Sequence, residues 1–95
     1  MIIDKGVSPG EVVTIKLTSG EELIASLVEE RNEYIKVSKP KVLASGHNGI
    51  GMVPYLFTVD PDRNIKLARA TIVVLEPSDK ESASQYTKST TGIIV

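Results

Sequence analysis

Apolar and polar side chains alternate through most of residues 13–37, and this alternation constrains the fold more than any other feature of the sequence. A two-residue period predicts β-strands that bury one face. Short turns at Ser19-Gly20 and Arg31-Asn32 interrupt the pattern, so the segment predicts an antiparallel meander. The apolar positions are Val13, Ile15 and Leu17, then Leu23, Ala25 and Leu27, then Ile35 and Val37.

The whole chain predicts five strands, at residues 11–18, 21–29, 33–44, 52–59 and 65–75. In the third strand, Pro40 cannot donate a ladder hydrogen bond, so the strand bends, bulges or lies on an edge there. Three glycines within residues 45–51 predict a loop, and residues 60–64 predict a turn. Both faces of the fourth strand are largely apolar, which favours burial against the core on one side and an interface on the other.

The end of the chain predicts a short helix. Pro77 stops the last strand, and Ser78 and Glu81 have the spacing of a capping box. The helix is expected over residues 79–88, with Tyr86 facing the body of the protein, and Ile93-Ile94-Val95 is an exposed apolar terminus unless it docks. The fold class is therefore all-β, a five-stranded, strongly bent antiparallel barrel with a short C-terminal helix.

Length and composition bound the possible functions. The chain has 95 residues, which fits one domain, with a segment at 1–10, the barrel at 11–77 and the helix and tail at 78–95. It has no cysteine, so disulfides and thiolate metal sites are excluded. No apolar run could span a membrane and the start does not resemble a signal peptide, so we expect a cytoplasmic protein without a membrane partner.

The charge of the chain is unevenly distributed. The net charge is −1, yet residues 31–69 contain seven Lys or Arg and three Asp or Glu. Such a split is compatible with one basic face, although chance scatter of surface charge explains it equally well.

Residues that could support catalysis are scarce. The single histidine, His47, stands in the glycine loop, where a solvated residue is more common than a catalyst. No acidic residues have metal-ligand spacing. We therefore expect a protein that is not an enzyme and that has no cofactor or metal.

The turn after the second strand is a better candidate for binding. Arg31, Asn32 and Tyr34 supply a guanidinium, an amide and an aromatic ring, the groups that stack on bases and bond their edges. The alternative is an ordinary surface turn in which Tyr34 packs. Lys36, Lys39 and Lys41 form either a basic edge or a strand guarded against aggregation.

The first half of the chain resembles the Sm-like (LSm and Hfq-type) RNA-binding family, and the whole chain resembles the small Sm-like proteins of marine cyanophages. Ala25 stands where that family has glycine. Two arginines compete for the position of the family's second-motif arginine, Arg63 by strand count and Arg69 by local sequence. The first-motif positions that match the family are Val13, Ile15, Leu17, Gly20, Leu23 and Leu27.

This resemblance implies an Sm-like (SH3-like) barrel and a non-catalytic protein that binds single-stranded RNA, or DNA, in the host cytoplasm if the protein is viral. It also implies a closed homo-oligomeric ring of about five to seven subunits, joined through the fourth and fifth strands. The alternative is a structural or adaptor ring, such as a phage component, that binds no nucleic acid. The candidate nucleic-acid-binding residues are Arg31, Asn32, Tyr34, Arg63, Lys66 and Arg69.

Overall fold

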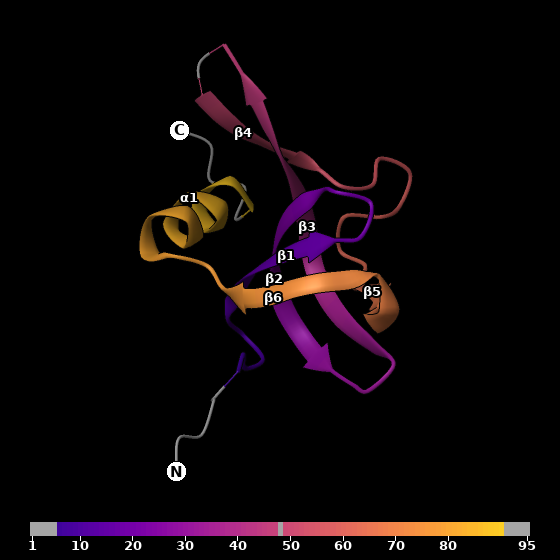
Figure 1. Cartoon of the computed structure of the whole chain (residues 1–95). Coiled ribbons are helices and arrows are strands. Elements are labelled where there is room, and N and C mark those ends of the chain that lie inside the picture. The colour runs from indigo at the N-terminus through magenta and orange to yellow at the C-terminus, as the bar shows by residue number, and fades with distance from the viewer. Residues whose placement is uncertain (1–5, 48, 91–95) are drawn as a thin grey trace.

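The computed structural model describes residues 6–47 and 49–90, and these residues form a mostly antiparallel β-sheet with one C-terminal α-helix (Figure 1). This confirms the predicted all-β class with a terminal helix. The elements are β1 (Val12–Leu17), β2 (Glu22–Glu30), β3 (Tyr34–Gly46), β4 (Gly49–Pro54), β5 (Ile65–Ala68), the 3-10 helix η1 (Arg69–Thr71), β6 (Ile72–Pro77) and α1 (Lys80–Thr90).

The strands pair in the order β4-β3-β2-β1-β6, and β5 pairs with β3 outside this path. The long strand β3 uses both of its edges. One edge pairs with β2, and the other pairs with β5 near its start and with β4 near its end. In Figure 1 the β3–β4 hairpin extends above the other strands, and α1 lies beside them. The pairings among the described residues do not close the sheet on itself.

The strand count is corrected from five to six. β4 ends at Pro54, where the chain leaves β3, and pairing resumes only at Ile65, opposite Val37. The last backbone bond between these strands runs from the Tyr55 N–H to the Pro40 carbonyl at 3.0 Å, and Pro40 has no N–H to return it, which accounts for the end of the β3–β4 ladder. The expected last strand is also divided, because η1 turns the chain from β5 beside β3 to β6 beside β1.

The expected loop at residues 45–51 is instead largely part of a hairpin. Ser45 pairs with Ile50 and Gly46 pairs with Gly49. Gly49 has φ 104°, a left-handed conformation that favours glycine, so the glycine supports the tight turn. Asn48, between these two pairs in the sequence, lies outside the described residues.

The apolar alternation of the sequence forms the core, as predicted. The alternate face of β2 is also covered, since Ile24 is buried although it points away from Leu23 and Ala25. The core cluster consists of Val13, Ile15, Leu17, Leu23, Ala25, Leu27, Ile35, Val37 and Leu67.

Pro40 stands at a bulge, one of the outcomes that its lack of an N–H predicts. Ile24 pairs with Lys41 and Ser26 pairs with Ser38, so β3 contains one residue more than β2 between these pairs. Lys39 has φ 49°, an uncommon conformation for a residue other than glycine. The bulge therefore interrupts the regular ladder between β2 and β3.

Tyr86 of α1 bonds backbone groups on both strands at this bulge. Its single hydroxyl proton is shared between the carbonyl oxygens of Ser38 and Lys39, at 2.8 and 3.0 Å, and its oxygen accepts the N–H of Ser26 at 3.1 Å. Tyr86 is only 3% exposed, which confirms that it faces the body of the protein. Burial raises the pKa of this hydroxyl to about 12.

The helix cap lies one residue later than the sequence predicts. The Asp79 carboxylate accepts the Ser82 N–H at 2.8 Å and the Ser82 hydroxyl at 3.0 Å, so Asp79 is the N-cap. The Ser78 hydroxyl instead bonds the Thr14 hydroxyl at 2.7 Å and joins the start of the helix to β1. The helix itself, over Lys80–Thr90, confirms the prediction to within two residues.

The two ends of the chain are described only in part. Residues 6–10 contain no helix, and residues 1–5 and the tail 91–95, including the apolar terminus, lie outside the described residues. Neither helix of the described chain is long and apolar enough to cross a membrane.

Candidate nucleic-acid interface

The β2–β3 turn and the β5–η1 junction lie side by side at one end of the sheet. The ladder between β3 and β5 places Tyr34 opposite Ala68, and the next residue, Arg69, donates its backbone N–H to the Glu33 carbonyl at 2.9 Å. The turn itself is closed by the Arg31 N–H, which donates to the Tyr34 carbonyl at 2.9 Å. Two segments that are far apart in the sequence therefore form one surface.

Tyr34 and Lys66 form a cation–aromatic pair on this surface. The Lys66 Nζ lies 4.9 Å from the centre of the Tyr34 ring, within the range of a cation–π contact. The pair is diagonal across two strands, because Lys66 stands directly opposite Lys36 in the ladder. The half-buried Tyr34 ring is thus held in place beside a positive charge.

Arg69 holds the other side of the junction. Its Nη2 lies 2.9 Å from Glu30 Oε2. The Arg69 side chain is 40% exposed and the Glu30 side chain is 35% exposed. Its Nη1 is buried and has no hydrogen-bond partner among the described residues. One donor of this guanidinium is therefore not used by the described part of the chain.

Glu29 gathers two further cations beside the turn. Arg31 donates from Nε to Glu29 Oε2 at 2.6 Å, and Lys36 Nζ lies 3.4 Å from Glu29 Oε1. The hydrogen bond from Arg31 lowers the pKa of the Glu29 carboxyl, and the same bond raises the pKa of the Arg31 guanidinium. These contacts hold Arg31 over the end of β2 and partly neutralise its charge.

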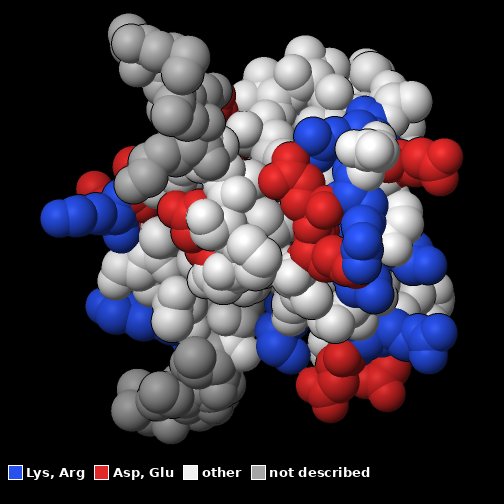
Figure 2. Space-filling view, turned by 90° about the horizontal axis from the view of Figure 1, so that it is seen from below, with Lys and Arg blue, Asp and Glu red and all other residues white. Residues whose placement is uncertain are grey.

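The surface at this end of the molecule carries both signs of charge. Figure 2 views the molecule from below, the end at which the β2–β3 turn lies, and shows basic and acidic side chains next to one another. The carboxylates of the turn region are Glu29, Glu30 and Glu33. Four cations, Arg31, Lys36, Lys66 and Arg69, lie among these three carboxylates, so the local net charge is +1.

Of the six residues that the sequence suggests, the structure brings five together. Asn32 is exposed in the turn between Arg31 and Tyr34, and its amide has no hydrogen-bond partner among the described residues. Arg63 lies apart, in the turn beyond the far end of β5, where Ile65 pairs with Val37. Of the two arginines that compete for the second-motif position, Arg69 is the one beside the β2–β3 turn.

The sequence reasoning did not find the carboxylates that accompany these cations. Glu29 and Arg31 are two residues apart at the end of β2, and that spacing was an available signal, because such residues share a side of an extended chain. The Glu30–Arg69 pair depends on the pairing of β3 with β5, which no local pattern reveals. Within residues 6–47 and 49–90, no group of three or more acidic or histidine side chains could hold a metal ion.

Comparison with known proteins adds no relative: no family model and no curated protein matches this chain. The function is therefore inferred from the residues and geometry of the chain itself.

Proposed function

We propose that this protein is a ring-forming Sm-like barrel that binds single-stranded RNA, or DNA, without catalysis. The observation that carries the proposal is the meeting of the β2–β3 turn with the β5–η1 junction. It joins an aromatic ring, Tyr34, to the cations Lys66 and Arg69 and to the exposed amide of Asn32. Stacking on rings, amide bonds to base edges and nearby positive charge are how proteins hold unpaired bases.

The route of the chain supports the barrel. The three residues of η1 connect β5, which lies beside β3, to β6, which lies beside β1. Thr18, the residue after β1, donates its N–H to the Thr71 carbonyl of η1 at 2.8 Å. This bond joins η1 to the end of β1. One core cluster takes side chains from β1, β2, β3 and β5, as a closed sheet around a single core requires.

The two outermost strands support a ring. β4 pairs only with β3 and β6 pairs only with β1 within the described chain, so each has an edge open to another strand. Exposed aliphatic side chains lie on both, with Ile50 73% and Val73 62% exposed. Pairing β4 of one subunit with β6 of the next is a head-to-tail contact, and such contacts close into rings when the rotation allows.

A binding titration tests the nucleic-acid part of the proposal. Labelled oligo-U and oligo-A are titrated with the protein by fluorescence anisotropy at low salt and at about 0.15 M salt. We expect binding at low salt that weakens as salt rises, because phosphate contacts release counterions. Absence of binding at low salt would contradict the proposal.

Matched variants locate the site. Arg69→Ala removes a cation of the junction, whereas Arg63→Ala removes one that lies outside it. We expect Arg69→Ala to weaken binding by about 10- to 100-fold and Arg63→Ala to leave it nearly unchanged, because one charge-assisted contact is worth about 1.5–3 kcal/mol. The Arg31→Ala/Tyr34→Ala variant should bind more weakly still, and an unchanged affinity in that variant would place any binding elsewhere.

The second candidate is a structural or adaptor ring that binds no nucleic acid. Its support is the local charge, because Arg31, Lys36 and Arg69 are each paired with a carboxylate. Phosphate binding would have to compete with these ion pairs. A stable ring in solution that retains neither oligonucleotide would favour this candidate.

A further inference from the structure

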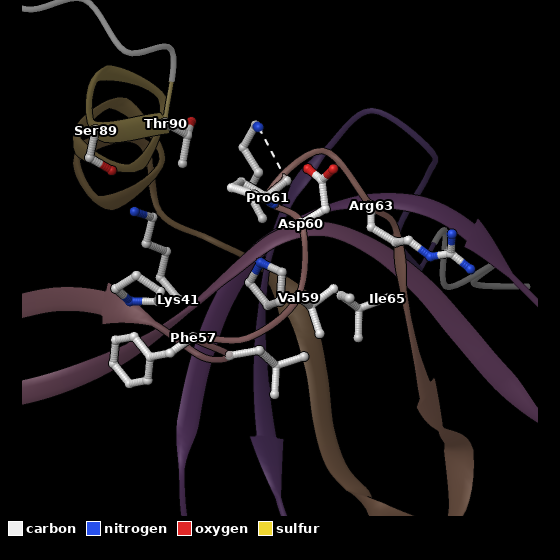
Figure 3. Close-up of a pocket in the computed structure, with 13 residues that line it drawn as sticks. Lys41, Phe57, Val59, Asp60, Pro61, Arg63, Ile65, Ser89 and Thr90 are labelled. Atoms are coloured by element: carbon white, nitrogen blue, oxygen red, sulfur yellow. Dashed lines mark hydrogen bonds between the residues drawn. The ribbon is translucent and has the colours of Figure 1, made fainter.

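An apolar groove lies between the 55–64 segment, the bulge of β3 and the end of α1 (Figure 3). Its volume is about 360 Å³. Val59 and Ile65 lie near its middle, Phe57 lies at one end, and Ser89 and Thr90 approach from the last turn of the helix. The groove is on a different part of the molecule from the Tyr34–Arg69 junction.

The groove exposes apolar side chains on a segment that is held in place. Phe57 is 81% exposed, and Leu56 and Val59 are 39% and 37% exposed. The segment is joined to β3 by the Tyr55 N–H bonding the Pro40 carbonyl at 3.0 Å and by Lys39 Nζ lying 3.4 Å from Asp62 Oδ1. A grouped, exposed apolar surface on an ordered segment indicates a surface that is covered by something else.

We propose that the apolar end of this same chain, Ile93-Ile94-Val95, packs into the groove. Thr90, the last described residue, lines the groove. The tail, residues 91–95, therefore starts next to the groove. Five residues can extend up to about 17 Å, which exceeds what is needed to reach from one side of a small groove to the other. The groove and its occupant are then parts of one chain.

The sequence after the helix suits this return. Gly92 stands two residues beyond Thr90, the last residue of α1. Glycine just beyond a helix commonly takes the left-handed conformation that turns the chain off the helix axis, and the apolar residue that follows packs back. Residues 91–95 contain three aliphatic side chains and none that is charged, which matches an apolar groove.

The groove is less suited to an anion or a nucleic acid. Of its three basic lining residues, Lys39 is bonded to Asp62 and Pro61, and the Arg63 side chain points away from the helix end and Phe57 in Figure 3, which leaves Lys41. Asp60 adds a negative charge to the lining. A tethered segment also has a high effective concentration, so it would occupy the groove ahead of a free ligand.

The first test is the thermal stability of tail variants in the full chain. Ile93→Asp/Ile94→Asp removes the apolar surface of the tail, and the matched control Ile93→Val/Ile94→Val keeps it. We expect the Asp variant to lower Tm by about 5 °C, the shift that follows loss of a buried aliphatic contact in a chain of this size, and the Val variant to change it little. In a Phe57→Ala background the Asp substitutions should cost less, because their partner is already gone. Equal losses in both backgrounds would overturn the proposal.

The second test reports directly on the groove. The chain has no tryptophan, so Phe57→Trp places a single fluorophore there. We expect acrylamide to quench it severalfold more in the Ile93→Asp/Ile94→Asp background than with the natural tail. Quenching that is the same with both tails would overturn the proposal, as would protection that appears only at high protein concentration, since that result would assign the occupant to a second copy. Neither test involves nucleic acid, so its outcome is independent of the proposed function.

Discussion

At the scale of single residues, the Tyr86 hydroxyl joins the helix to the sheet. It is bonded to three backbone groups that flank the bulge at Lys39-Pro40. We expect Tyr86→Phe to lower the free energy of unfolding by about 1–3 kcal/mol, because the Ser26 N–H and the two carbonyls lose this partner. Urea denaturation measures the loss.

The control for this variant is Tyr55→Phe. Tyr55 is partly buried and packs against the core, but its hydroxyl makes no hydrogen bond with the described residues. Its loss should change the free energy of unfolding by less than about 0.5 kcal/mol. Equal effects of the two substitutions would show that the Tyr86 hydroxyl contributes no more than an unbonded one.

The raised pKa of Tyr86 predicts a specific response to alkali. The folded hydroxyl has a pKa of about 12, against an ordinary value of 10.0. Between these values the unfolded chain loses the proton while the folded chain keeps it, so stability falls as pH rises from about 10 to 12. The stability advantage of the natural protein over Tyr86→Phe should therefore be constant below pH 10 and shrink above it. Urea titrations at stepwise higher pH test this, and a constant difference up to pH 12 would contradict it.

At the scale of elements, α1 depends on Asp79 for its start. The carboxylate accepts two hydrogen bonds from Ser82, and the one from the backbone N–H is the main cause of the lowered pKa of Asp79. We expect Asp79→Ala to lower the thermal midpoint by a few degrees at neutral pH. Glu81→Ala, which removes the side chain that a capping box would use, should have no such effect.

The pH dependence of the cap has the opposite sign to that of Tyr86. Because the pKa of Asp79 is lowered in the folded protein, its contribution is present above the ordinary carboxyl pKa and is lost as pH falls through the lowered value. The difference between the natural protein and Asp79→Ala should disappear in acid. Thermal scans by circular dichroism measure it, and Asp79→Asn shows how much of the cap survives without the charge.

The elements differ in how far the sequence could predict them. The first three strands lie within two residues of their expected bounds, because their apolar alternation is tied to one core face. The predicted bounds of the fourth and fifth strands were wrong, because β4 ends at Pro54 and η1 divides the fifth strand at Arg69–Thr71. These breaks depend on which stretch of β3 each strand pairs with. The alternation of apolar and polar residues within one strand does not reveal its partner.

The same distinction applies to the candidate site. Arg31, Asn32 and Tyr34 are neighbours in the sequence, so a turn was enough to group them. The choice of Arg69 over Arg63 needed the register of β5 on β3, in which Ala68 stands opposite Tyr34. The helix cap shows the limit of a motif, because Ser78 has the required spacing but its hydroxyl bonds Thr14 on another strand.

At the scale of the whole molecule, the open edges of β4 and β6 determine how one copy can pair with another. Each exposes aliphatic side chains, and a monomer would leave both edges free to pair with other chains. Repeating the Tyr34–Lys66–Arg69 junction around a ring would also turn weak single contacts into a stronger combined one. Assembly and binding are thus linked in the proposed function.

Light scattering on variants of one edge tests this assembly. One chain has a mass of 10.3 kDa, and we expect the natural protein to have about five to seven times that mass in solution. Val73→Lys places a charge on the edge strand β6, where the natural side chain is 62% exposed, and should reduce the mass to that of one chain. Thr87→Lys, an equal charge on an exposed position of α1, should leave the assembly intact. A natural protein that stays at the mass of one chain at all concentrations would remove the ring, and a Val73→Lys variant that still assembles would place the contact away from β6.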